Sequence, residues 1–391
     1  MQQQNWPEPD RDAQEHSARL VETIHEQIEA AGGTIPFERY MDLALYAPGL
    51  GYYTAGARKF GAGGDFVTAP EVSPLFARCL ARQCEEVFEE LGGGDILEPG
   101  AGSGVMAADV LIEVEARGAL PDRYLILETS AELRERQLQT LQKSVPHLLD
   151  RITWLDSPPE KFRGMLLANE VLDALPVARF RIEEDGYSEQ HVGWTGSNFI
   201  TRWRPASEQF TDELHEVLFG LPAPLRTPYI SEHCRRLPAF IRLLADSMDA
   251  GLMLFIDYGY PRREYYLPER RDGTLMCHYR HRAHGNPYVY PGLQDITAFV
   301  DFTAVAEAGV AAGFELHGYT SQAQFLLGSG LYDVLPEFEP GDTVRSLMVS
   351  QEVQKLMMPG EMGDRFKVMG LSRGVERLVK GFSLKDLSSA L

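Results

Sequence analysis

Three glycines stand at alternate positions directly after an apolar segment in ILEPGAGSG, residues 96–104. Gly100, Gly102 and Gly104 can adopt positive φ and let a ligand approach the backbone. A dinucleotide-binding loop has the pattern GxGxxG, whereas here the third glycine comes one residue earlier, and the lysine of a P-loop is absent. Glu98 precedes the loop, and its carboxylate would repel a phosphate and attract an ammonium or sulfonium group. The stretch therefore favours a cationic ligand over a nucleotide phosphate.

S-adenosylmethionine carries both an ammonium and a sulfonium group, and further polar residues follow the next predicted strands. We expect Ala101, inside the glycine loop, and Glu128 and Thr129, which end RYLILETS, to contact this cofactor. The Glu128 carboxylate can accept two hydrogen bonds from ribose hydroxyls, but dinucleotide-binding proteins use an acid in the same way. Asp156 lies in the loop after the next strand, where it either reads an adenine amino group or caps a turn.

The segment ANEVLDALPV, residues 168–177, places three polar side chains directly after the buried stretch MLL. The carboxyl ends of the strands border the ligand crevice in an open α/β sheet. We therefore expect Asn169 at the cofactor and Glu170 and Asp173 at the substrate. The alternative is that Asp173 caps a turn and Asn169 bonds to the backbone. Asp257, near the end of the strand GLMLFIDYG, is either a second carboxylate on the substrate side or a hydrogen-bonded structural acid.

Apolar segments of strand length alternate with segments of helical periodicity from residue 73 onward. Strands are expected at 95–97, 123–130, 152–158, from 164, and at 251–259, 314–320 and 366–373. Helices are expected at 73–91, 105–117, 131–143, 301–313, 321–334 and 343–357. This alternation predicts an α/β fold with a parallel, doubly wound Rossmann-like sheet.

Two regions depart from this alternation. The N-terminus is predicted to form helices at 13–31 and 36–46, followed by a long stretch rich in Gly, Pro and aromatic residues. Within that stretch GDFVTAPE, residues 64–71, is either a cover that brings Thr68 to the methionine end of the cofactor or a rigid packed loop. Residues 178–205 have period-2 segments and are expected to form antiparallel hairpins, with a helix over 232–249 before the sheet resumes.

Composition and charge exclude several classes of protein. The net charge of −20 disfavours binding to nucleic acid, and no apolar run approaches the ~20 residues that span a membrane. Four cysteines without a CxxC pair indicate reduced thiols and, with an N-terminus unlike a targeting signal, a cytoplasmic protein. The segment HYRHRAH contains three histidines, but the arginines between them would repel a cation, so we expect no metal site.

Several stretches in this chain resemble, in the same order, the MidA-like family of class I methyltransferases. The resemblance covers about Phe37 to Val375 and rests on MDLALYAPGLGYYT, GDFVTAPEVSPLF, LEPGAGSG, ANEVLDALPV, FIDYGY, QDITAFVDF and GDRFKVMGLSRG. It implies transfer of a methyl group from S-adenosyl-L-methionine, with S-adenosyl-L-homocysteine as the product. The family includes a mitochondrial complex I assembly-factor methyltransferase of the protein arginine type. The resemblance therefore implies an arginine-bearing protein substrate, such as a subunit of a respiratory complex I, whose guanidinium Glu170 would clamp with Asp173 assisting.

The predicted organisation has three parts. Residues 1–72 form an N-terminal helical and loop extension, residues 73–177 and 250–375 the class I methyltransferase domain, and residues 178–249 an inserted β-hairpin and helical subdomain on the substrate side. The oligomeric state is left open, with a homodimer as one option. Two other functions also stay open: a nicotinamide-dependent oxidoreductase, disfavoured by the early third glycine, and a non-catalytic assembly factor that binds a protein partner.

Overall fold

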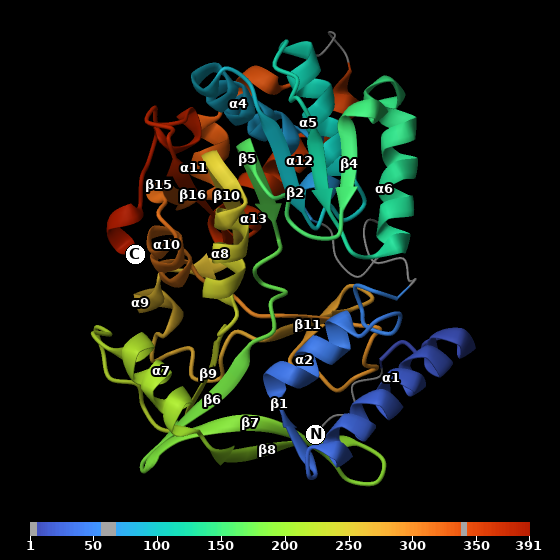
Figure 1. Cartoon of the computed structure of the whole chain (residues 1–391), viewed down its shortest axis with the longest axis vertical. Coiled ribbons are helices and arrows are strands. Elements are labelled where there is room, and N and C mark those ends of the chain that lie inside the picture. The colour runs from blue at the N-terminus through green and yellow to red at the C-terminus, as the bar shows by residue number, and fades with distance from the viewer. Residues whose placement is uncertain (1–5, 56–67, 338–341) are drawn as a thin grey trace. The chain divides into compact units, whose positions relative to one another are not determined.

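The computed structural model describes residues 6–55, 68–337 and 342–391. The chain divides into two compact units, each assembled from separate stretches of sequence (Figure 1). Unit 1 comprises Met1–Phe66, Ala174–Arg236 and Arg263–Ala298, and unit 2 comprises Val67–Asp173, Leu237–Arg262 and Phe299–Leu391. Within the described residues, no helix has the length and apolar character that crossing a membrane requires.

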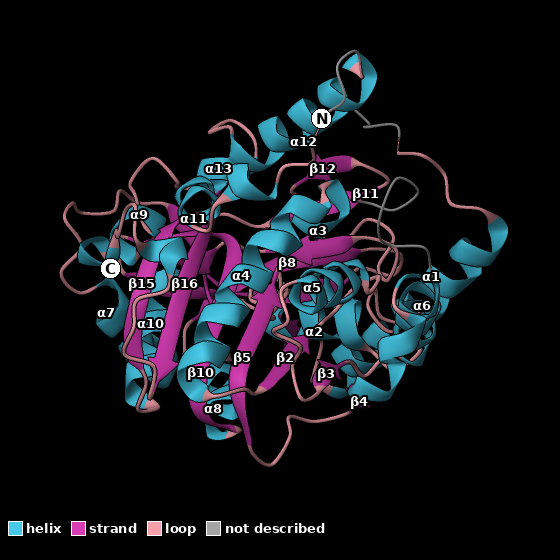
Figure 2. Cartoon of the chain, turned by 90° about the horizontal axis from the view of Figure 1, so that it is seen from above, coloured by secondary structure: helices cyan, strands magenta, loops and turns pink. Residues whose placement is uncertain are grey.

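Unit 2 is built on a sheet with the strand order β15-β16-β10-β5-β2-β3-β4 (Figure 2). The short β14 pairs with β10. The strands are β2 (Asp95–Pro99), β3 (Tyr124–Leu127), β4 (Ile152–Leu155), β5 (Phe162–Asn169), β10 (Met248–Tyr260), β14 (Val300–Asp301), β15 (Glu315–Ser321) and β16 (Phe366–Arg373). The strands from β10 to β4 run parallel, as predicted.

One strand differs from the predicted parallel sheet, because β16 runs antiparallel to both of its neighbours, β10 and β15. The predicted parallel pairing therefore holds from β10 to β4 and does not extend to β16. Seven of the eight residues of β16 are buried, as they would be in a central parallel strand. A segment that is apolar on both faces carries no sign of its direction, so the sequence could not reveal the reversal.

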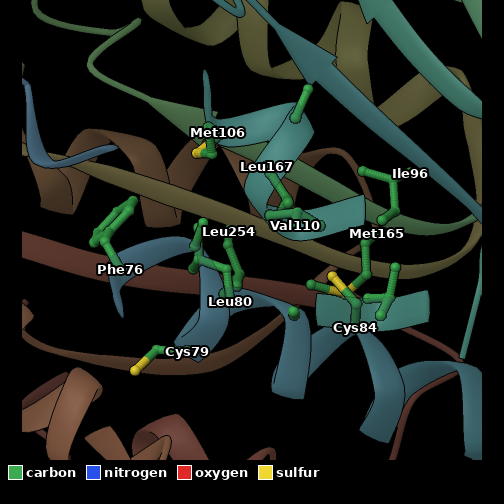
Figure 3. Close-up of a cluster of buried hydrophobic side chains, with 14 of the residues drawn as sticks. Phe76, Cys79, Leu80, Cys84, Ile96, Met106, Val110, Met165, Leu167 and Leu254 are labelled. Carbon is green, nitrogen blue, oxygen red and sulfur yellow. The ribbon is translucent and has the colours of Figure 1, made fainter. Parts of the chain in front are cut away.

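The helices of unit 2 lie on both faces of its sheet, which confirms the doubly wound arrangement. They are α3 (Ala69–Val72), α4 (Pro74–Leu91), α5 (Val105–Ala116), α6 (Ala131–Ser144), α8 (Leu237–Asp246), α10 (Phe302–Ala311), α11 (Gln322–Gly328), α12 (Thr343–Met357) and α13 (Met362–Arg365), with short 3-10 turns between some of them. Leu80 of α4 and Val110 of α5 pack with Ile96, Met165 and Leu254 of the sheet in one buried cluster (Figure 3). Helices α8 and α10 pack against each other and contact β10 outside that cluster.

Unit 1 combines α1 (Arg11–Ala30) and α2 (Phe37–Tyr46) with two antiparallel sheets. The larger sheet has the order β1-β7-β6-β9, with β8 paired to β7, and the smaller has the order β12-β11-β13. The strands are β1 (Thr34–Pro36), β6 (Ala178–Glu183), β7 (Gly186–Trp194), β8 (Phe199–Pro205), β9 (Tyr229–His233), β11 (Met276–Tyr279), β12 (Arg282–His284) and β13 (Asp295–Thr297). Helix α7 (Glu208–Leu218) follows β8, and α9 (Arg262–Tyr265) begins at the last residue before unit 1 resumes.

The units divide the chain differently from the predicted domains. The N-terminal helices and the hairpins 178–205 belong to one unit, since β1 pairs with β7. Residues 263–298, predicted as part of the methyltransferase domain, join unit 1, whereas α8 belongs to unit 2. The expected helix over 232–249 is shorter, because Tyr229–His233 forms β9 and pairs with β6. Strands of three or four residues, such as β11 to β13, carry too little periodicity to be predicted from sequence.

Candidate cofactor and acceptor site

The glycine loop between β2 and α5 adopts a conformation that favours glycine at all three alternate positions. The φ angles of Gly100, Gly102 and Gly104 are 67°, 54° and 81°. A Cβ on Gly104 would lie 3.0 Å from the Cα of Gln137, in the neighbouring helix α6. The third glycine is therefore required by the approach of α6 to the start of α5, in addition to its left-handed backbone.

Side chains from α6 also hold the carbonyl groups of this loop. The Gln137 Nε2 donates to the Gly102 carbonyl at 3.2 Å, and the Thr140 hydroxyl donates to the Ser103 carbonyl at 2.8 Å. The Ser103 hydroxyl donates to Glu71 in α3. Ala101 is buried at the centre of the loop. The loop is thus fixed by hydrogen bonds from two helices, so the directions of its backbone groups are set before any ligand arrives.

Glu98 lies inside β2 and is almost fully buried. The Tyr124 hydroxyl donates to its Oε2 at 2.6 Å from the adjacent strand β3. Burial raises the pKa of Glu98 to about 7, although the hydrogen bond from Tyr124 opposes that rise. Glu98 therefore stands next to the glycine loop as a carboxyl group that titrates near neutral pH.

Glu128 follows the last residue of β3, and its carboxylate is buried. The Ser130 N–H donates to Oε1 at 2.8 Å, and Gln137 Nε2 donates to Oε2 at 3.3 Å. Burial raises the pKa of Glu128, and these hydrogen bonds oppose the shift by favouring the ionised form. Thr129 lies between Glu128 and Ser130, which caps α6. The structure thus places Glu128 beside the glycine loop, joined to it through Gln137.

Asp156 follows β4 and is largely exposed to solvent. Its Oδ1 accepts a hydrogen bond from Arg134 Nη2 at 2.6 Å, and Arg134 Nε donates to the Glu128 carbonyl at 2.6 Å. Arg134 therefore links the ends of β3 and β4. Asp156 was predicted either to contact an adenine amino group or to cap a turn. The ion pair with Arg134 does not decide between these two roles.

Asn169 is the last residue of β5, and Glu170, directly after it, has a strained backbone conformation. Glu170 has a φ of 53°, which is uncommon for a residue with a side chain, and its N–H donates to the Ile256 carbonyl at 2.9 Å. Its Oε1 accepts from Asn169 Nδ2 at 3.1 Å and its Oε2 from the Tyr258 hydroxyl at 3.0 Å. The Asn169 Oδ1 is buried and has no hydrogen-bond partner among the described residues. Strained residues of this kind concentrate at functional sites.

Asp257 is buried in β10 and organises the loop that follows β5. Its Oδ2 accepts from the N–H groups of Leu172 and Asp173 at 2.9 and 3.2 Å, and its Oδ1 accepts from the Tyr258 N–H at 2.9 Å. Burial raises the pKa of Asp257 well above its usual range, and the negative charge of Glu170 adds to the effect. These three backbone donors favour the hydrogen-bonded structural acid over the second substrate-side carboxylate.

The remaining predicted residues are placed as follows. Asp173 is buried in the loop that Asp257 holds. Thr68 stands at the N-cap of α3, and Gly64–Val67 of the predicted cover lie outside the described residues. His278 and His284 lie on the paired strands β11 and β12. Across the described parts of the chain, no group of three or more His, Cys, Asp or Glu side chains could hold a metal ion.

Two residues of the site were not among the predictions, Gln137 and Trp154. The buried residues of α6 are Leu133, Gln137 and Leu141, which recur at every fourth position. A glutamine in the middle of an apolar stripe was the signal that sequence reasoning missed, because a buried amide must have hydrogen-bond partners. The Trp154 indole supplies one, donating to Gln137 Oε1 at 2.9 Å.

Comparisons with known proteins agree with this geometry. A family model described as "Putative S-adenosyl-L-methionine-dependent methyltransferase" matches residues 79–320. The protein arginine methyltransferase NDUFAF7 homolog of Drosophila melanogaster is 27% identical, over 94% of this chain and 88% of its own. The NDUFAF7 protein of Danio rerio is 28% identical, over 86% of this chain and 83% of its own. A Burkholderia thailandensis crystal structure bound to S-adenosyl-homocysteine is 45% identical with a TM-score of 0.94, covering 99% of this chain and 100% of that one.

The curated relatives overturn the predicted cytoplasmic location. The names of the Drosophila, Danio rerio and Homo sapiens proteins describe those proteins as mitochondrial. The prediction rested on an N-terminus unlike a targeting signal and on the four cysteines, none of which forms a disulfide within the described residues. Free thiols report reducing conditions and do not distinguish one reducing compartment from another. The matched family model spans more than half of the chain, and the chain therefore belongs to this family of S-adenosyl-L-methionine-dependent methyltransferases.

Proposed function

We propose that this protein transfers the methyl group of S-adenosyl-L-methionine to an arginine side chain of a protein. The observation that carries the proposal is the Glu170 carboxylate, held at the end of β5 by Asn169 and Tyr258. The names of the curated relatives support the class of acceptor, since they are called protein arginine methyltransferases. The acceptor expected from the family resemblance, a subunit of a respiratory complex I, stays a prediction.

Three features of unit 2 fit the cofactor. The glycine loop lets a ligand approach the backbone at Gly100 and Gly102, whose φ angles are positive. Glu128 offers a buried carboxylate for ribose hydroxyls. The buried Asn169 Oδ1 lacks a partner among the described residues and would accept a hydrogen bond from the ammonium group of the methionine part. The relative from Burkholderia thailandensis, bound to S-adenosyl-homocysteine, supports the same assignment.

The chemistry then divides between the cofactor and this chain. Bound S-adenosylmethionine supplies an activated methyl group, because its sulfur leaves as a neutral thioether. Glu170 would bind the guanidinium through two parallel N–H to oxygen bonds, which orients the attacking nitrogen. When the cofactor is bound, its methyl group would pass to the attacking nitrogen as the sulfur–carbon bond breaks, and a carboxylate of the site would accept the proton that this nitrogen releases. Asp173 remains the predicted assistant, and Asp257 holds the loop that carries both residues.

A binding experiment separates this function from the two alternatives. We expect isothermal titration to give saturable binding of S-adenosylmethionine to the purified protein, loss of that binding in Glu128→Ala, and no binding of NADH. Saturable NADH binding would instead support the nicotinamide-dependent oxidoreductase. Binding of neither ligand would support the non-catalytic assembly factor and refute the proposed cofactor.

A second experiment tests the acceptor. The protein is incubated with an isotope-labelled methyl donor and a library of arginine-containing peptides, and methylarginine is identified by mass spectrometry. Glu170→Gln should leave cofactor affinity unchanged and lower turnover by about 100-fold, because the neutral amide cannot balance the guanidinium charge. Asp249→Asn is the matched control. Asp249 lies on the same strand as Asp257, and it is an exposed acid that forms an ion pair with Lys161. Label on another residue type, or a fully active Glu170→Gln, would contradict the arginine assignment.

A further inference from the structure

Gln137 joins the ends of three neighbouring strands from a position inside α6. Its side chain is fully buried, with an exposed fraction of 0%. The amide nitrogen donates to the Gly102 carbonyl after β2 and to Glu128 Oε2 after β3, at 3.2 and 3.3 Å. The amide oxygen accepts from the Trp154 indole on β4 at 2.9 Å. A single side chain thus fixes the glycine loop, the acid and the next strand relative to one another.

The chemistry of these neighbours fixes which way the amide points. The Trp154 indole can only donate a hydrogen bond, and a backbone carbonyl and a carboxylate can only accept one. The Gln137 oxygen must therefore face Trp154, while its two N–H groups face Gly102 and Glu128. Rotating the amide by half a turn would place its N–H groups against the indole N–H and its oxygen against the two acceptors. The hydrogen bond from Trp154 therefore fixes the orientation of the Gln137 amide.

The Glu128 carboxylate keeps room for a ligand with two adjacent hydroxyl groups. A carboxylate has about four acceptor sites, two on each oxygen. Ser130 N–H occupies a site on Oε1, Gln137 occupies a site on Oε2, and the backbone of Thr129 also hydrogen-bonds the carboxylate. These bonds fix the plane of the carboxylate without using all of its acceptor sites. The 2′- and 3′-hydroxyls of a ribose present two donors side by side.

We propose that Gln137 is a positioning residue that aligns the Glu128 carboxylate with the two ribose hydroxyls of the cofactor. The inference rests on the proposed function, because it requires the S-adenosyl group to bind at Glu128. Gln137 itself does not touch the cofactor in this account. It acts by holding Oε2 of Glu128, so that the carboxylate does not depend on the backbone of Thr129 and Ser130 alone for its orientation.

The test compares two ligands on one variant. S-adenosyl-homocysteine and its 2′,3′-dideoxy analogue are titrated into the wild-type protein and into Gln137→Met, which keeps the length of the side chain and removes the amide. Affinity for S-adenosyl-homocysteine should fall by about tenfold, the size expected for losing hydrogen bonds to a charged group. Affinity for the dideoxy analogue should stay within about twofold, since it has no hydroxyls for Glu128 to bind.

Two further variants guard against a general loss of structure. Trp154→Phe removes the indole N–H that orients the amide, together with part of the ring, and should give the same preference between the two ligands with a smaller loss of affinity. Thr140→Val is the matched control, because Thr140 lies on the same helix and bonds the loop without contacting Glu128. It should change affinity for both ligands by the same factor. Equal losses for both ligands in Gln137→Met would overturn the inference alone. Failure of the wild-type protein to bind S-adenosyl-homocysteine would overturn the proposed function as well.

Discussion

Gly104, at the start of α5, must be a glycine for two reasons, its left-handed backbone and the close approach of α6. Replacing it by alanine, and comparing the result with a second glycine, separates the two. The φ of Gly104 is 81°, and its Cβ would lie 3.0 Å from the Gln137 Cα. Gly118, just beyond the other end of α5, has a φ of 72° and nothing within 4 Å of its Cβ. Both substitutions place a side chain in the left-handed region, at a cost of about 1–2 kcal/mol. Only Gly104→Ala also meets a backbone atom.

The contact should separate the two variants. Forcing a methyl group into a packed region costs about 1–3 kcal/mol, so Gly104→Ala should lose about 2–5 kcal/mol in total and Gly118→Ala about 1–2 kcal/mol. In a unit of this size each kcal/mol lowers Tm by about 2–4 °C, so thermal unfolding resolves the difference. The Gln137 backbone belongs to a helix and cannot rotate away, as the tip of a flexible side chain could.

Cofactor binding provides the second measurement. Gly104→Ala should weaken S-adenosyl-homocysteine binding, because moving α6 away from α5 also shifts Gln137, which holds Glu128 Oε2. Gly118→Ala should bind it like the wild-type protein, since its site lies at the far end of α5. Equal losses of Tm in the two variants would refute the reasoning, since the left-handed φ would then account for the whole effect and the approach of α6 for none.

Three more measurements follow from the buried site. Burial raises the pKa of Glu98 from 4.5 to about 7, so its contribution to stability is present at acid pH and is lost as the pH rises through that range. In urea titrations, the stability of the wild-type protein relative to Glu98→Gln should fall by up to about 3 kcal/mol between about pH 5 and 8. Stability curves that run parallel for the two proteins over this pH range would contradict the prediction. Asp257→Asn should destabilise the protein by about 1–3 kcal/mol in the same assay, because an amide has a single acceptor oxygen and cannot accept from both the Leu172 N–H and the Tyr258 N–H. An unchanged unfolding midpoint would count against the anchoring role. Tyr258→Phe should raise the acceptor KM several-fold with cofactor Kd unchanged, since it removes the hydrogen bond from the Tyr258 hydroxyl to Glu170 Oε2. A changed cofactor Kd would instead show that Tyr258 acts on the cofactor side of the site.

The fold was predictable where burial and periodicity agree. Strand and helix alternation over 95–169 predicts β2, α5, β3, α6, β4 and β5 in order, and all six are present. The direction of β16 was not predictable, because its residues are buried on both sides. The membership of residues 263–298 in unit 1 was also not predictable, because that region is held by short strands and long-range pairing such as β11 with β13.

For the site, position was easier to predict than role. Glu128 and Glu170 could be selected because each follows a buried strand, where the ligand crevice of an α/β sheet opens. Whether Asp257 contacts a substrate or anchors a loop depends on three backbone N–H groups that fold back onto it. Those donors come from residues 84 or more positions away in two of the three cases, so no local pattern contains them. Roles set by distant hydrogen bonds therefore required the structure.

The arrangement of carboxyl groups explains why this sheet edge suits a cation. Asp257, Glu170, Glu98 and Glu128 belong to, or directly follow, the neighbouring strands β10, β5, β2 and β3. Burial is the main cause of the raised pKa in three of them, Asp257, Glu98 and Glu128. Ionising these groups together is costly without positive charge nearby, and a pyrophosphate would add to that cost. A sulfonium, an ammonium or a guanidinium would relieve it instead. The same row of acids that disfavours a dinucleotide therefore favours both a cationic methyl donor and a cationic acceptor.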